Sequence, residues 1–309
     1  MKPKKNGQSI FFDINLREIA AFIDWKFFFL AWRLTGKFDD IATVCDCTSC
    51  KVGWLQQYDE KDRPKAEEAL KLFKDAQEIL REIFNKKSLK INASVYLSEA
   101  YSDENDNIIF NTENGELKIP MLRQQHPSTD GFCYSLSDFL AEKNDFCGAF
   151  VTTVLGVEEM AEKFDKEDDV YTSILIKTLA DRLAEAAAEW LHFKVRREIW
   201  GYATDEKLSI KEMLQTKYQG IRPAVGYPSL PDQSIIFDLD GILKFNEIGV
   251  SLTENGAMFP NASVCGLYFA HPKSKYFMIG KIDENQLADY AQRRGKTSEE
   301  LKKWLASNI

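Results

Sequence analysis

The 309-residue sequence contains no Gly-x-Gly pair, and this absence excludes several common enzyme classes. Dinucleotide-binding folds and the usual nucleotide-fold methyltransferases need a glycine-rich loop that lets the backbone approach a nucleotide closely. A phosphate-binding P-loop and a Gly-x-Ser-x-Gly nucleophile elbow are also absent. The chain has only three histidines, His126, His192 and His271, and they are widely spaced. The sequence therefore gives no support for hydrolytic chemistry.

Long hydrophobic runs are missing as well. The apolar run 27–32 is far shorter than the roughly 20 residues that a membrane helix needs, and Lys26 and Arg33 flank it. The N-terminus is basic, but no apolar segment follows it, so we expect no secretory signal, no membrane partner and a cytoplasmic location. The formal net charge of −8 argues against a nucleic-acid partner, which requires a dense cationic surface.

The chain alternates between helical and strand-like spacings of its apolar residues. Helical spacing predicts helices after Asp24, with Phe27 near the buried side, over 64–86 and over 170–199, and two more at the C-terminus. Period-two patterns predict strands at 89–93, 108–110, 117–122, 146–155, 264–269 and 276–282. Helices segregated around an antiparallel sheet indicate an α+β fold. Because no linker or repeat divides the sequence, we expect one domain over residues 1–309.

The segment 218–228 is unusual in composition. It contains two glycines, two prolines, two tyrosines and one arginine within eleven residues. Prolines fix the backbone, whereas glycines allow a backbone to approach a ligand closely. Arg222 could then hold a carboxylate through paired hydrogen bonds. The same composition also suits a rigid loop with a surface arginine, and composition alone leaves both interpretations open.

Four separated stretches resemble the activation domain of cobalamin-dependent methionine synthase. The stretch 221–228 is similar to the Arg-x-x-x-Gly-Tyr motif of that domain. The stretches 180–186, 252–258 and 274–277 are similar to regions that flank the motif, and all four occur in the family's order. The similarity extends from about residue 10 to residue 306, and it is densest after residue 170.

The resemblance implies a fold, a ligand and a partner. Domains of that family are single C-shaped α+β units with a twisted antiparallel sheet and long flanking helices. They bind S-adenosylmethionine and use its methyl group to remethylate cobalamin that has been oxidised to the cob(II)alamin state. A flavodoxin or flavodoxin-like reductase supplies one electron. We therefore expect S-adenosylmethionine as the ligand, cobalamin on a partner protein, and a methyltransferase component that is not active alone.

Carried over position by position, the resemblance assigns ligand-binding roles to Asp24, Arg222, Ala224, Gly226, Tyr227, Tyr276 and Phe277. Arg222 would bind the ligand's carboxylate, and Asp24 its amino group. Tyr227 would help to enclose the ligand, and Ala224 would contribute a main-chain contact. Without the resemblance, Asp24 is equally well explained as a helix N-cap, and the aromatic pair at 276 and 277 as core or strand packing. No catalytic side chain is expected, because methyl transfer moves no proton.

The chain begins near the activation domain, so the homocysteine, folate and cobalamin modules of the family are expected to act in trans. The expected partner is a separate cobalamin-binding methionine synthase. Two alternatives stay open: a non-catalytic S-adenosylmethionine-binding regulator of a corrinoid protein, and a reactivator of another corrinoid methyltransferase. Lys194, Arg196 and Arg197 are weak candidates for a flavodoxin-docking surface, since helix C-termini favour cations in any case. His271 is expected at a turn rather than as a cobalt ligand.

Cys45, Cys47 and Cys50 lie outside the family pattern. Three thiols within six residues are compatible with a zinc or iron–sulfur site that takes a fourth ligand from elsewhere. A loop of reduced or redox-sensitive thiols is the simpler interpretation, so the sequence assigns no metal. The isolated residues Cys133, Cys147 and Cys265 are expected to be small buried hydrophobes.

Overall fold

The structure, a computed structural model, describes residues 1–38 and 40–309, and a six-stranded antiparallel sheet forms its centre. In order across the sheet the strands are β4 (Gly115–Pro120), β3 (Asn107–Thr112), β2 (Lys90–Ser102), β5 (Asp145–Leu155) and β8 (Ser263–Tyr268). The sixth strand, β1 (Gly7–Phe11), pairs with the middle of β2, and β3 pairs with the end of β2. A separate pair is formed by β6 (Ser251–Leu252) and β7 (Met258–Phe259). The expected α+β class is confirmed.

Helices cover both faces of this sheet. Successive residues of the central strands belong alternately to two different hydrophobic cores. Val95 and Phe150 join the core that contains α6 (Val170–Lys194), whereas Tyr96 and Val151 join the core that contains α8 (Ile235–Leu243). Since successive strand residues point to opposite faces, α6 and α8 lie on opposite sides of the sheet. The strands β2 and β5 are therefore buried on both faces, and nearly all their residues in succession are buried.

The helix expected over 170–199 forms as α6 followed by a π-helical turn, Val195–Ile199. Asp169 caps its start by accepting a hydrogen bond from the N–H of Thr172. Near its middle the Oγ1 of Thr152, on β5, donates to the carbonyl of Ala184 at 3.0 Å. The alanine-rich centre of α6 thus allows the helix backbone to lie directly against the sheet.

The outer edge of β8 is extended by the segment 221–225. Ile221 and Phe269 exchange two backbone hydrogen bonds of 3.0 Å, and Leu267 N–H donates to the carbonyl of Pro223 at 3.0 Å. Gly266 makes this approach possible, because a Cβ there would lie 2.3 Å from the Pro223 carbonyl oxygen. The sheet therefore sets the backbone position of the only arginine in this segment, Arg222.

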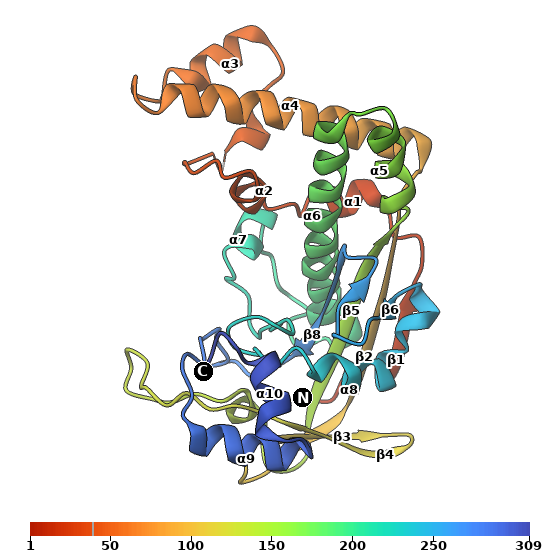
Figure 1. Cartoon of the computed structure of the whole chain (residues 1–309), viewed down its shortest axis with the longest axis vertical. Helices are drawn as coiled ribbons and strands as arrows, with labels where there is room; N and C mark the ends of the chain where they lie inside the picture. The colour runs from red at the N-terminus through yellow and green to blue at the C-terminus, as the bar shows by residue number, and fades with distance from the viewer. Residues whose placement is uncertain (39) are drawn as a thin grey trace.

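The remaining helices form an upper and a lower group (Figure 1). The upper group contains α1 (Leu16–Ala20), α2 (Trp25–Ala31), α3 (Thr48–Leu55), α4 (Arg63–Lys86) and α5 (Val157–Lys166). α7 (Ile210–Leu214) lies below α2, and α9 (Glu284–Arg294) and α10 (Ser298–Trp304) form the lower group. Short 3-10 turns occur at Ile41–Thr43, Leu136–Phe139 and Phe245–Ile248. Both groups extend to the left of a recessed middle in Figure 1, which agrees with the expected C shape.

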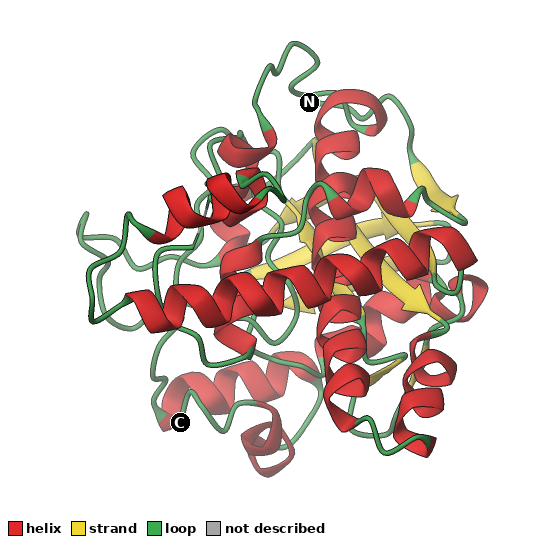
Figure 2. Cartoon of the chain, turned by 90° about the horizontal axis from the view of Figure 1, so that it is seen from above, coloured by secondary structure: helices red, strands yellow, loops and turns green. Residues whose placement is uncertain are grey.

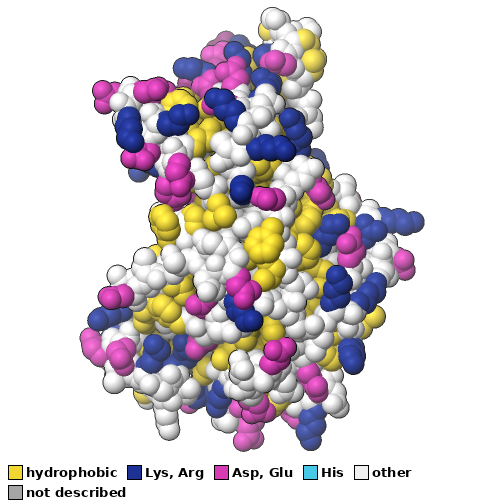
Figure 3. Space-filling view, turned by 90° about the vertical axis from the view of Figure 1, so that its right-hand side faces the viewer, with side chains coloured by type: hydrophobic (Ala, Val, Ile, Leu, Met, Phe, Trp, Pro, Cys, Tyr) yellow, Lys and Arg dark blue, Asp and Glu magenta, His cyan; other side chains and the backbone are white. Residues whose placement is uncertain are grey.

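From above, α4 crosses over the strands of the sheet (Figure 2). The face in Figure 3 mixes acidic and basic side chains, with hydrophobic ones gathered around its middle. Within the described residues, every helix is too short or too polar to cross a bilayer.

Two details of the sequence-based prediction are wrong. Residues 276–282 do not form a strand. Instead of a continuous strand ladder, their backbone groups make single hydrogen bonds to loops that are distant in the sequence. The N–H of Ile279 donates to the carbonyl of Pro228, and the Met278 carbonyl accepts from Gln124 Nε2. Phe27, which the sequence predicts near the buried side of its helix, is 52% exposed.

The contact between Gly266 and Pro223 yields a stability prediction. Gly266→Ala should lower the free energy of unfolding by about 1–3 kcal/mol, the usual cost of forcing extra volume into a packed site. Urea denaturation followed by circular dichroism measures the change. Gly241 is the matched control, since it lies mid-helix in α8 with open space around its Cβ position. Gly241→Ala should be neutral or stabilising by up to about 1 kcal/mol. Equal effects of the two substitutions would contradict the close approach.

Candidate functional site

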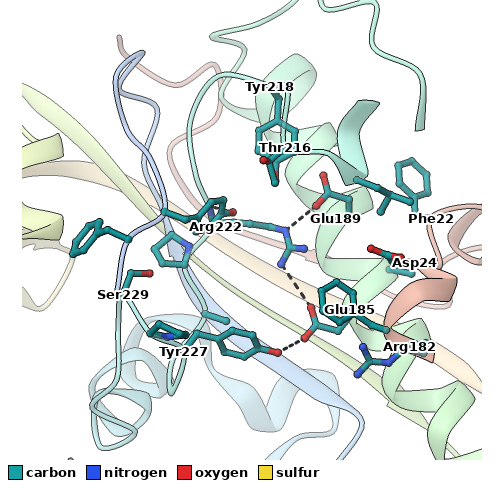
Figure 4. Close-up of a pocket in the computed structure, with 18 of the residues that line it drawn as sticks. Phe22, Asp24, Arg182, Glu185, Glu189, Thr216, Tyr218, Arg222, Tyr227 and Ser229 are labelled. Atoms are coloured by element: carbon teal, nitrogen blue, oxygen red, sulfur yellow. Dashed lines mark hydrogen bonds and ion pairs between the residues drawn. The ribbon is translucent and has the colours of Figure 1, made fainter. Parts of the chain in front are cut away.

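A pocket of about 520 Å³ opens between α6, α2 and the segment that runs along β8 (Figure 4). This volume is typical of small-molecule sites, which span roughly 300–1,000 Å³. Six of the seven residues predicted to bind a ligand line it: Asp24, Arg222, Ala224, Tyr227, Tyr276 and Phe277. Residues that are far apart in the sequence, from Asp24 to Phe277, therefore line one cavity.

Arg222 is held firmly inside this pocket. Its Nε donates to Glu189 Oε2 at 3.0 Å, and its Nη1 lies 3.8 Å from Glu185 Oε2. Its backbone N–H donates to the hydroxyl of Tyr276 at 3.0 Å. Burial alone would lower the pKa of Arg222, but the adjacent Glu189 carboxylate raises that pKa well above its usual value. The side chain is only 18% exposed, so the interpretation of Arg222 as a surface arginine is wrong.

The acidic partners of Arg222 come from α6 and were not among the predicted site residues. Arg182, Glu185 and Glu189 follow each other at spacings of three and four, so they lie on one face of the helix. Glu185 also accepts a hydrogen bond of 2.6 Å from the hydroxyl of Tyr227. The spacing was visible in the sequence, but it equally suits a solvated helix face. Only the position of the 221–225 segment reveals that these carboxylates point into a cavity.

Aromatic and charged groups support the wall formed by Tyr218. The guanidinium of Arg196 lies 4.2 Å from the centre of the Tyr218 ring, and His192 meets that ring edge-on at 4.8 Å. Burial, reinforced by the positive charges of Arg196 and Arg222, lowers the pKa of His192 well below its usual value. His192 is therefore neutral at pH 7. It packs against Tyr218 and adds no charge next to the pocket.

The assignment of Arg196 to a docking surface is wrong. Its side chain is fully buried and makes two hydrogen bonds, of 2.8 and 2.7 Å, to the carboxylate of Glu206. The π-helical turn that follows α6 directs Arg196 inward, beneath the pocket. Sequence spacing treated Lys194, Arg196 and Arg197 as one cationic helix end, and the π-helical turn breaks that pattern.

The N-cap interpretation of Asp24 is confirmed, whereas its contact with a ligand's amino group stays a prediction. This residue is the N-cap of α2, where its side chain accepts from the N–H of Lys26 at 3.0 Å, and it also lines the pocket. Gly226 differs from the other six residues, since it forms the adjacent turn with a φ of +83° and does not line the cavity. A Cβ at Gly226 would lie 2.4 Å from the side-chain oxygen of Gln233. Its assignment to ligand binding stays a prediction.

The charges that line the pocket nearly balance. Three carboxylates (Asp24, Glu185 and Glu189) face two guanidinium groups (Arg182 and Arg222), which gives a formal net charge of −1. Aromatic rings of phenylalanine and tyrosine form much of the remaining wall. Such a site is suited to a ligand that carries a carboxylate together with positive charge, because guanidinium groups hold carboxylates and aromatic faces attract cations.

Comparison with known proteins identifies the family. The sequence model described as "Vitamin B12 dependent methionine synthase, activation domain" matches residues 15–295. The chain belongs to this family. It is also similar to a crystal structure described as the MetH reactivation domain bound to AdoHcy, with 36% sequence identity and a TM-score of 0.87. That match covers 100% of this chain and 92% of the other, so the activation-domain fold extends over the whole chain.

Other predicted residues lie outside the pocket. His271 lies at a turn, as expected, where its Nδ1 accepts from the N–H of Lys273. Cys147 and Cys265 are buried, but Cys133 is partly exposed, so the prediction of burial is wrong for Cys133 alone. Cys45, Cys47 and Cys50 are exposed and adjacent; hydrogen bonds from Ser49 and Cys50 lower the pKa of Cys47 to about 6.

The buried Glu189 yields a second prediction. Glu189→Gln removes the charge that Arg222 and Arg196 share, so it should lower the free energy of unfolding by about 1.5–3 kcal/mol, the usual worth of a hydrogen bond to a charged group. Glu198→Gln is the control, because Glu198 is 59% exposed and pairs with Lys194 one turn away. That change should stay within about 0.5 kcal/mol. Urea denaturation measures the free energy of unfolding of both variants. Equal values would show that the charge of Glu189 does not stabilise the fold.

Proposed function

We propose that this pocket binds S-adenosylmethionine, with Arg222 on its carboxylate and Asp24 on its ammonium group. The observation that carries the proposal is the meeting of these two residues in one cavity with aromatic walls and a net charge of −1. S-adenosylmethionine bears one carboxylate, one ammonium and one sulfonium, so its net charge of about +1 complements the pocket. The crystal structure of the related MetH domain, which is bound to AdoHcy, supports the same class of ligand.

The contacts of Arg222 leave room for a further carboxylate. A guanidinium carries five N–H donors, and Nε and Nη1 are the nitrogens with carboxylate neighbours here. The remaining donors can meet the ligand while Glu189 keeps the group oriented. Because Glu189 fixes one edge of the guanidinium before the ligand binds, the Arg222 side chain loses little conformational freedom on binding.

The other predicted residues enclose the ligand. Tyr227 and Tyr276 are 51% and 43% exposed, so their rings border the mouth of the pocket, and Ala224 offers main-chain contact below them. Phe277 supplies a ring without the hydroxyl that the family often has at this place. Gly226 contributes through the turn that presents Tyr227.

We further propose that this chain supplies the methyl group for reductive remethylation of cob(II)alamin on a cobalamin-binding methionine synthase module, with a flavodoxin-like protein as electron donor. The family to which the chain belongs supports this role. S-adenosylmethionine supplies a methyl group on a sulfonium, and its transfer needs no acid or base. The contribution of the pocket residues is therefore to position the ligand, which lowers the entropic part of the barrier.

Arg222 and Asp24 give a binding prediction. Arg222→Ala should weaken S-adenosylmethionine binding by about 10- to 100-fold, since a hydrogen bond to a charged group is worth about 1.5–3 kcal/mol. Asp24→Asn should also weaken binding, yet leave stability unchanged because asparagine caps helices as well as aspartate. Isothermal titration calorimetry measures both. Arg81→Ala, on the exposed side of α4, serves as the control and should bind normally. Normal affinity in a folded Arg222→Ala protein would refute the assignment.

Turnover is tested separately from binding. A cobalamin-binding module loaded with cob(II)alamin should form methylated cobalamin, seen by absorbance, only when this chain, S-adenosylmethionine and a reductant are all present. Arg222→Ala should reduce the rate at low ligand concentration. Ligand binding with no methylation of any corrinoid protein would instead favour the non-catalytic regulator. Methylation of another corrinoid methyltransferase, but not of methionine synthase, would favour the third function.

A further inference from the structure

Three cysteine side chains converge on the upper group of helices, away from the pocket that contains Arg222. The Sγ atoms of Cys45, Cys47 and Cys50 all lie within 4.8 Å of one another. Thiolates that share a tetrahedral Zn²⁺ at about 2.3 Å lie about 3.8 Å apart. Small side-chain rotations would therefore bring these three sulfurs to one ion without moving the backbone.

The local backbone already orients the sulfur atoms. The N–H of Cys47 donates to the Sγ of Cys45, and the N–H of Cys50 donates to the Sγ of Cys47, both at 3.4 Å. Cys47 is the N-cap of α3, and the hydroxyl of Ser49 lies 3.2 Å from its sulfur. Hydrogen bonds of this kind orient metal ligands and offset the negative charge of thiolates. They are independent of the distances between the sulfurs.

Core packing does not explain why three cysteines lie together here. All three thiols are exposed, so they do not contribute to a hydrophobic core. The carboxylate of Asp46 pairs with Lys51. Among the residues that the structure describes, no fourth histidine, cysteine, aspartate or glutamate atom joins the three sulfurs. A fourth coordination position would therefore face solvent.

We propose that Cys45, Cys47 and Cys50 bind one divalent ion of the zinc class as three thiolates, with the fourth position taken by water or an external ligand. Binding replaces three S–H bonds with three metal–sulfur bonds and releases the protons to solvent, and no atom changes its oxidation state. Ligation joins the loop before α3 to the first turn of that helix. A helix of eight residues is short, and this connection would stabilise its start.

Co²⁺ tests the site, because it replaces Zn²⁺ and gives intense sulfur-to-metal absorption bands when thiolates bind. The full chain, without an affinity tag, is reduced, stripped of metal and titrated. We expect one equivalent of Co²⁺, with thiolate bands, and its displacement by Zn²⁺. Cys47→Ser should weaken Co²⁺ binding at least about 100-fold, since loss of a ligand exceeds the 10- to 100-fold effect of losing a supporting contact. Cys133→Ser, a partly exposed cysteine elsewhere, should bind normally.

A second measurement does not depend on any variant. One equivalent of Zn²⁺ should protect three thiols of the native chain from a thiol-labelling reagent, with mass spectrometry locating them at positions 45, 47 and 50. Absent thiolate bands, unchanged binding by Cys47→Ser, or unprotected thiols would each overturn the proposal. So would purified protein that carries several irons and inorganic sulfide per chain. None of these results depends on S-adenosylmethionine binding.

Discussion

The ion pair between Arg222 and Glu189 connects the two structural elements that build the pocket. Arg222 lies on the segment beside β8, whereas Glu189 lies on α6, which crosses one face of the same sheet. A buried ion pair is weak evidence of stability, since desolvation offsets much of the Coulomb attraction. Its clearer effect is geometric: the carboxylate fixes one edge of the guanidinium at 3.0 Å and leaves its remaining donors directed elsewhere.

Small residues make this geometry possible. Gly266 allows the backbone of Pro223 to approach β8, and Ala184 allows α6 to approach β5. A larger side chain at either place would separate Arg222 from Glu189 by displacing one of the two elements. The ion pair therefore depends on close backbone packing at Gly266 and Ala184, two residues that do not themselves line the ligand pocket. Packing of this density tolerates little added volume.

The sequence predicted the elements with strong periodicity and missed features that depend on distant partners. The helices over 64–86 and 170–199 were evident because many apolar residues repeat along them. Residues 276–282 carry a similar apolar pattern, but their backbone bonds to loops far away in sequence, which no local pattern reveals. Arg196 was misjudged for the same reason, since a π-helical turn directs it towards Glu206. Likewise, the resemblance indicated Arg222 and Asp24, whereas Glu185 and Glu189 gained meaning only once α6 was seen beside the 221–225 segment.

The pocket combines a rigid base with an open rim, and this contrast suits the proposed transfer to a second macromolecule. At the base, Arg196 and His192 fix the ring of Tyr218 from behind. At the rim, Tyr227 and Tyr276 are about half exposed, and each is tied by its hydroxyl to an element of the site, Glu185 or the Arg222 backbone. A ligand whose amino-acid end is gripped deeply would keep its reactive end near that rim. Methyl transfer to a cofactor carried by another module requires both properties, because the donor must be held still while its methyl group remains accessible.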